Sequence, residues 1–188
     1  MKTDVEALRK KYMDNPPEGL TSTDIRHMSE EDLLDMDYFL NDDDLDEGGA
    51  NSQSIIILAE CEGKKILLPG DSTPKVLCDA LQYYNKTNGT PLELDLMKLP
   101  HHGSTRNVTK NIIDEIKCSN FIISTKKNKK YYFPNKETIA KLIRYRESAD
   151  KAINVYFNYQ ESLDILGITA DELKKNNINL NVCNGFRI

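Results

Sequence analysis

The pattern of apolar and polar residues in this chain changes at about residue 50. From residue 51 onward, runs with the alternation or the β-branched character of strands are separated by segments whose apolar residues recur at helical spacing. The predicted strands are Ser54–Glu60, Lys65–Leu68, Leu92–Leu99, Phe121–Ser124, Ile153–Phe157 and Ile178–Val182. This alternation of strands and helices predicts a layered α/β domain.

The helical segments have recognisable starting residues. Thr73 is suited to cap a helix that Pro74 opens and that continues to about Asn85. Residues 108–116 have the apolar spacing of another helix, and Asn135 is suited to cap a further one.

The first two predicted strands form a hairpin. Ser54–Glu60 is rich in β-branched residues, which predicts a buried strand, and a turn at Glu62-Gly63 connects it to Lys65–Leu68. Leu92–Leu99 alternates apolar and polar residues, which predicts a single strand covered on one face.

The first 50 residues have a different character. Asp4–Tyr12 is predicted to form a short helix that ends before Pro16-Pro17. Glu30–Glu47 holds ten acidic residues and no basic one, which indicates an extended, solvated linker. We therefore expect an amino-terminal extension over residues 1–50 and one domain over residues 51–188.

Composition narrows the possible environments. The net charge of −5 gives no global sign of a nucleic-acid-binding surface. The sequence has no apolar run long enough for a bilayer span and no secretion signal, so we expect a cytoplasmic protein without a membrane partner. The four cysteines form no CxxC pair, which predicts reduced thiols rather than a disulfide framework or a zinc ribbon.

The segment Leu67–Ser72, LLPGDS, is the first that could carry chemistry. Gly70 permits a tight turn at the end of a strand, so Asp71 could lie in an open mouth and bridge cations or accept protons. The alternative is a turn aspartate that caps the following helix.

The second such segment is Lys98–Thr105, KLPHHGST. His101 and His102 follow a strand, and imidazole is a common ligand of transition metals. One ring could bind a metal while the other orients a neighbouring group, or both could be exposed loop histidines. The third histidine, His27, has no companion and is expected to be a solvated loop residue.

Three stretches together, NSQSIIILAECEGKKILLPGD, ELDLMKLPHHGS and FIISTKKNKKYYFPNKETIAKL, resemble the later part of the metallo-β-lactamase superfamily. More narrowly, they resemble the hydrolase domain of bacterial competence DNA-uptake channel proteins and its stand-alone relatives. The resemblance implies a metallo-β-lactamase-like layered sheet with helices, present as its carboxy-terminal half only. It covers the chain from about Asn51 to Leu142.

The resemblance also implies site residues. Asp71 would bridge two metal ions, zinc or another divalent transition metal, and His101 or His102 would ligate one of them. Ser104 would contact the substrate. Lys129 and Lys130 lie in a basic stretch that could hold a phosphate backbone, with a solvated hairpin tip as the alternative.

The family's first metal motif, His-x-His-x-Asp-His, is absent from this sequence, so the ligand set is incomplete. The leading hypothesis is a metal-dependent, phosphoesterase-like hydrolase that is incomplete as a single chain. The alternative is a non-catalytic or split-enzyme module that needs a partner chain. Under both, we expect a homo-oligomer or a complementary chain to cover the exposed sheet. Nucleic acid or another phosphoester is the expected substrate.

Overall fold

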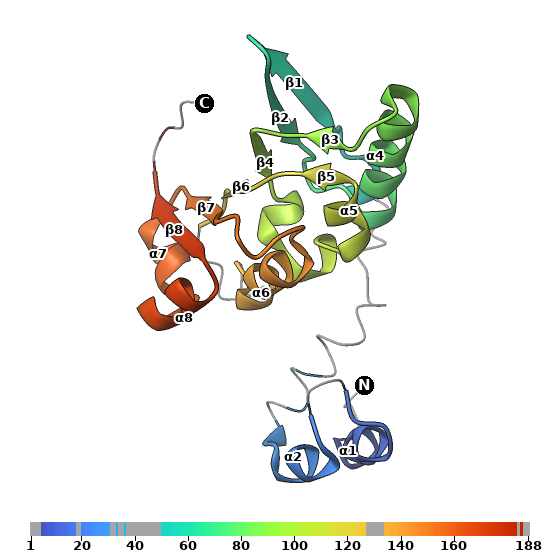
Figure 1. Cartoon of the computed structure of the whole chain (residues 1–188), viewed down its shortest axis with the longest axis vertical. Coiled ribbons are helices and arrows are strands. Elements are labelled where there is room, and N and C mark those ends of the chain that lie inside the picture. The colour runs from blue at the N-terminus through green and yellow to red at the C-terminus, as the bar shows by residue number, and fades with distance from the viewer. Residues whose placement is uncertain are drawn as a thin grey trace. The chain divides into compact units, whose positions relative to one another are not determined.

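The computed structural model describes residues 5–17, 20–30, 33, 36, 50–126, 134–183 and 185. The chain forms two compact units, Met1–Asp44 and Leu45–Ile188 (Figure 1). Most of the acidic run lies outside the described residues. None of the helices that the structure describes combines the length and the apolar character needed to cross a bilayer.

The first unit contains two short helices, α1 (Val5–Asp14) and α2 (Ser22–His27). Their apolar faces meet in a small core of Leu8, Tyr12, Ile25 and Leu33. Arg9 of α1 donates hydrogen bonds to the carbonyls of Ile25 and Met28, at 2.6 and 2.8 Å, near the end of α2. These carbonyls would otherwise lack helical partners, so the guanidinium fastens the two helices together.

The second unit is built on a six-stranded sheet (Figure 1). Its strands, in spatial order, are β1 (Ile57–Cys61), β2 (Lys64–Leu68), β4 (Leu96–Lys98), β6 (Asn120–Ile123), β7 (Ile153–Phe157) and β8 (Ile178–Val182). β1 is antiparallel to β2, and all other neighbours are parallel. A second, two-stranded parallel sheet pairs β3 (Leu92–Glu93) with β5 (Ile116–Lys117). The carboxyl ends of β2, β4 and β6 therefore meet at one edge of the large sheet.

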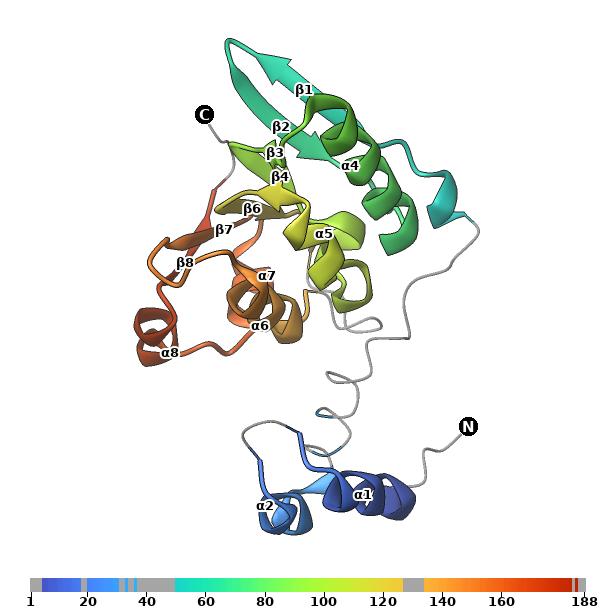
Figure 2. The ribbon, with the colours of Figure 1, turned by 45° about the vertical axis from the view of Figure 1, so that its right-hand side comes forward.

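Helices follow the strands and pack against one face of this sheet (Figure 2). They are α4 (Pro74–Asn88), α5 (Lys110–Asp114), α6 (Lys136–Tyr145), α7 (Gln160–Asp164) and α8 (Ala170–Lys175). Single turns of 3₁₀ helix occupy Asn51–Gln53 and Thr105–Asn107, whereas Pro100–Gly103 forms a tight turn in which His101 and His102 have non-helical backbone angles. Register pairs Leu67, Met97, Phe121 and Val155 across neighbouring strands, and all four are buried in the core with apolar residues of α4, α5 and α6.

The α/β prediction is confirmed, and β7 and β8 have the predicted bounds. The prediction that Ser54–Glu60 is a buried strand is wrong. β1 begins at Ile57 and is mostly exposed, because it forms an edge of the sheet and only Leu58 of its apolar residues packs against the core. A β-branched run therefore identified a strand here but not its burial.

The single strand predicted over Leu92–Leu99 is also wrong, because the chain changes sheets at its middle. The Leu94 N–H donates to the carbonyl of Lys117, beside the small sheet, whereas the Asp95 N–H donates to the carbonyl of Lys65, beside the large one. The predicted helix over residues 108–116 is shorter than expected, since Ile116 belongs to β5.

The face of the sheet opposite the helices differs in character. Ile57 and Leu68, which are cross-strand partners, are 50% and 38% exposed. Ile66, Leu96 and Ile122 lie on the same face and are not part of the helix-covered core cluster. This face thus carries apolar side chains for which the described helices provide no layer.

A pH-dependent feature lies at the start of α8. The Glu172 carboxylate accepts hydrogen bonds from the backbone and hydroxyl of Thr169 and pairs with Lys136, and these contacts lower its pKa to about 2. A lowered carboxyl pKa contributes stability above its unfolded value near 4.5, and this contribution is lost as pH falls toward 2.

In an NMR titration of side-chain carboxyl carbons, we expect Glu172 to titrate near 2. A midpoint near 4.5 would show that the capping box is not formed.

Candidate functional site

Asp71 lies just beyond the carboxyl end of β2. Gly70, at φ 61°, turns the chain there, and a Cβ at this position would lie 3.3 Å from the carbonyl oxygen of Ile55. Thr73 occupies the N-cap position of α4 as predicted, but its side chain makes no capping hydrogen bond. Asp71 is 41% exposed and faces the segment that follows β4.

Three consecutive residues after β4 have left-handed backbone conformations: His101 at φ 44°, His102 at φ 59° and Gly103 at φ 78°. For residues with a Cβ, this region costs about 1–2 kcal/mol each. Such conformations persist only where the surroundings hold them, and they concentrate at functional sites. The histidine pair is therefore held in a specific, strained arrangement.

His102 is oriented by the end of β6. Its Nδ1 lies 2.8 Å from the carbonyl oxygen of Ser124, which can only accept, so Nδ1 carries the proton. In the neutral ring, the Nε2 atom then presents its lone pair, 3.8 Å from Oδ2 of Asp71. An imidazole with one nitrogen bonded to a carbonyl and the other available is the usual arrangement of a metal ligand.

His101 has a different role in the geometry. Its backbone N–H donates to the carbonyl of Gly70 at 3.1 Å, which ties the loop after β4 to the loop after β2. Its ring lies edge-on to that of His102, with the ring centres 6.2 Å apart. The sequence left the choice between the two histidines open, and the structure places His102 beside Asp71.

Hydrogen bonds from side chains of α6 and of Asn135 hold the loop that follows β4, a role that the sequence did not predict for these residues. Thr138 of α6 donates to the carbonyl of Gly103 at 2.7 Å, and the fully buried Lys141 donates to that of Thr105 at 2.8 Å. The Asn135 side chain accepts from the Thr105 N–H at 3.2 Å instead of making the capping bond that the sequence suggested. The sequence did not indicate the burial of Lys141, because a lysine is expected to be exposed.

Lys98, the last residue of β4, adds a positive charge near the carboxylate. Its ammonium lies 3.4 Å from the carbonyl of Gly70 and 3.3 Å from that of Leu99. Burial lowers the pKa of Lys98, while the negative charge of Asp71 opposes this shift. Lys98 therefore partly balances the charge that would attract a cation to Asp71.

The distance between the Asp71 and His102 donor atoms is compatible with one shared divalent ion. Ligand atoms at about 2.0–2.2 Å from a common ion can be at most about 4 Å apart. However, no cluster of three or more His, Cys, Asp or Glu side chains that could hold a metal exists among the described residues. The donors present fit a single ion with an incomplete ligand shell, and they do not fit the two-ion centre that the family resemblance implies.

The structure describes Ser104 and His27 but not the two predicted lysines. Ser104 is buried at 4% exposure, and its N–H donates to the carbonyl of His101, so it helps close the histidine turn. Lys129 and Lys130 lie outside the described residues. His27 is exposed as expected, but it is the last residue of α2 rather than a loop residue.

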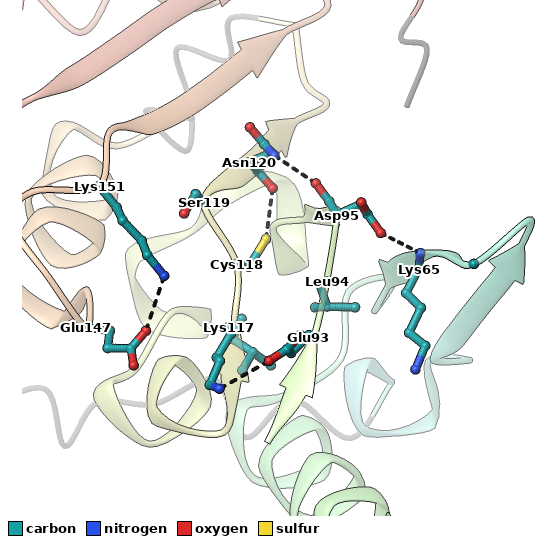
Figure 3. A pocket seen from close by; sticks show the side chains of 12 residues that line it. Lys65, Glu93, Leu94, Asp95, Lys117, Cys118, Ser119, Asn120, Glu147 and Lys151 are labelled. Carbon is teal, nitrogen blue, oxygen red and sulfur yellow. Dashed lines mark hydrogen bonds and ion pairs between the residues drawn. The ribbon is translucent and has the colours of Figure 1, made fainter. Parts of the chain in front are cut away.

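A separate hollow of about 600 Å³ lies at the opposite edge of the sheet, where β4 and β6 begin (Figure 3). Its lysines are paired with carboxylates, Lys117 with Glu93 at 3.1 Å and Lys151 with Glu147 at 3.8 Å. Burial raises the pKa of Cys118 there to about 12, so its thiol is protonated at neutral pH. This hollow shares no residue with the Asp71–His102 pair.

This chain is similar to part of a known protein. No family model matches the sequence. The chain is 26% identical over 120 residues to Recombination protein 2 of Haemophilus influenzae, an alignment that covers 61% of this chain and 14% of that protein. The chain is thus similar to a small segment of a much longer relative.

Gly103 provides a test of the strained turn. A Cβ there would lie 3.2 Å from the side chain of buried Ile123 and would also be strained by the positive φ. We expect Gly103→Ala to lower the free energy of unfolding by about 2–4 kcal/mol in urea titrations. Gly89→Ala is the matched control, because Gly89 also has a positive φ but open space around it, and it should cost only about 1 kcal/mol. Equal losses would contradict a packing constraint at Gly103.

Proposed function

We propose that the second unit is a divalent-metal-binding half of a metallo-β-lactamase-like phosphoester hydrolase, and that it needs a complementary chain to complete its site. The observation that carries this proposal is the distance of 3.8 Å between Asp71 Oδ2 and His102 Nε2, at the carboxyl ends of the parallel strands β2, β4 and β6. Ligand sites in such sheets lie at this edge. A divalent ion bound here would supply Lewis acidity toward an ester or phosphoester oxygen.

The chain's own residues define what happens at this edge. The Ser124 carbonyl keeps the proton on His102 Nδ1, and the Gly70 carbonyl anchors the His101 backbone. Both carboxylate and imidazole are about two-fifths exposed, so a substrate can reach them from solvent. The name of the Haemophilus influenzae relative refers to recombination, a process of nucleic acids, which directs the substrate hypothesis to phosphodiesters.

The second candidate function is a non-catalytic interaction module. The apolar side chains exposed on the face of the sheet opposite the helices favour it, since Ile57 and Leu68 are 50% and 38% exposed. A complementary chain covering this face would serve both candidates. Metal binding at Asp71 and His102 separates them, because an interaction module has no need of it.

The test is zinc binding measured by isothermal titration calorimetry, with elemental analysis for stoichiometry. We expect about one ion per chain, because two donors are present rather than the larger set of a two-ion centre. Asp71→Asn and His102→Ala should each weaken binding about tenfold or more, since each removes one of two ligands.

Asp79→Asn is the matched control for these variants. Asp79 is an exposed aspartate on α4 that pairs with Lys75 at 2.6 Å, so its loss should leave zinc affinity unchanged. Wild-type affinity in both Asp71→Asn and His102→Ala would exclude the metal site and leave the interaction module.

Substitution of Lys98 is predicted to raise zinc affinity, whereas the substitutions of Asp71 and His102 lower it. Its ammonium repels a cation approaching Asp71, so Lys98→Met should strengthen zinc binding about threefold or more at low ionic strength. Lys110→Met is a suitable control, because Lys110 is an exposed lysine paired with Asp114. Weaker zinc binding in Lys98→Met would show that the lysine supports the site instead of opposing a cation.

A further inference from the structure

β8 forms an edge of the six-stranded sheet (Figure 1). It pairs with β7 on one side, and no described strand pairs with its other side. The Asn177 carbonyl accepts from the Ile153 N–H, and the Cys183 N–H donates to the Phe157 carbonyl, so the odd-numbered residues face β7. Because backbone groups alternate sides along a strand, the outward N–H and C=O groups belong to Ile178, Leu180 and Val182.

This edge lacks the usual protection against pairing with another strand. Natural edge strands commonly carry charged residues, proline or a bulge. Residues 176–185, NNINLNVCNG, contain neither a charged residue nor a proline, although 29% of the chain is charged. An uncharged and regular edge of this kind favours the addition of a further strand.

The strand is also complementary to itself. Its sequence, INLNV, has an asparagine on each side of Leu180 and a β-branched residue at each end. Antiparallel pairing with a second copy, centred on Leu180, matches Asn179 with Asn181 and Ile178 with Val182. The outward backbone groups then face one another as hydrogen-bonded pairs, which is the parity that an antiparallel ladder requires. We infer that β8 pairs with β8 of a second copy of this chain and joins two sheets into one.

Side chains on the uncovered face support this pairing. The Asn154 amide donates to the side-chain oxygen of Asn120, and the Asn179 amide donates to that of Asn154, each at 2.9 Å. This row of amides ends at the edge with Asn179. Pairing of the two copies would continue it with Asn181 of the partner subunit, because residues directly opposite in an antiparallel pair have neighbouring side chains.

The helix-covered side also has room for a partner. A hollow of about 420 Å³ follows β8 along α8, lined by Leu173, Lys174 and residues 177–181 among others. Val182 is 39% exposed, and in the dimer it would be covered beside Ile178 of the partner subunit. The contact is small, so we expect a reversible dimer with a dissociation constant of about 1–100 µM.

Sedimentation velocity of the full chain over a concentration series, at low salt, tests the pairing. Two double variants share Asn179→Lys and differ only at residue 181, with Asn181→Lys in one and Asn181→Asp in the other. In the predicted register, residue 179 faces residue 181 of the partner subunit twice per dimer. The first variant therefore places like charges together, and the second places opposite charges together.

We expect dimers for the wild type and for the Lys–Asp variant. For the Lys–Lys variant, we expect a dimer dissociation constant about tenfold higher or more. A wild type that is monomeric up to about 200 µM, or equal dissociation of the two variants, would overturn the proposal. Amide exchange gives a measurement without substitutions. The outward N–H of Leu180 should become protected only at concentrations where the dimer forms, and protection that is independent of concentration would equally contradict the pairing.

Discussion

The hydrogen bond between His102 Nδ1 and the Ser124 carbonyl is the interaction on which the candidate site depends. It fixes which imidazole nitrogen carries the proton and directs the other toward Asp71. The bond is possible because β2, β4 and β6 are parallel neighbours, so their carboxyl ends deliver three segments to one edge. Without this alignment, the carboxylate and the imidazole would be ordinary loop residues.

Neighbouring side chains hold the backbone next to this bond in left-handed conformations of high energy. Two histidines and a glycine in succession are left-handed, while Ile123 limits the space at Gly103 and α6 holds the Gly103 and Thr105 carbonyls. The rigid support is compatible with a site that must be organised before a ligand binds. Lys98 nevertheless places positive charge near the same carboxylate, so the single chain is not an optimised cation site. In the function proposed above, the remaining donors would come from a complementary chain.

Sequence patterns predicted much of the fold because strand and helix periods are local properties. β7 and β8 matched the predicted bounds, and α6 follows Asn135 as expected. Burial and sheet membership were not predictable, because they depend on neighbours far along the chain. β1 became an exposed edge, and a single alternating run was divided at Leu94 and Asp95 by hydrogen bonds to Lys117 and Lys65.

The candidate site was predictable in part, because its residues stand in two short segments of the sequence. The segments LLPGDS and KLPHHGST drew attention to Asp71 and to both histidines. The choice of His102 required the position of Ser124, and the supporting roles of Thr138 and Lys141 required the packing of α6 under the loop. None of these contacts has a periodic signature in the sequence.

The tautomer of His102, observed by long-range proton–nitrogen NMR, tests the metal-binding pair most directly. We predict that the neutral ring carries its proton on Nδ1 and that zinc causes a large shift of the Nε2 resonance, because Nε2 is the nitrogen beside Asp71. A proton on Nε2, or an Nε2 resonance that zinc leaves unchanged, would contradict the proposed metal-binding pair.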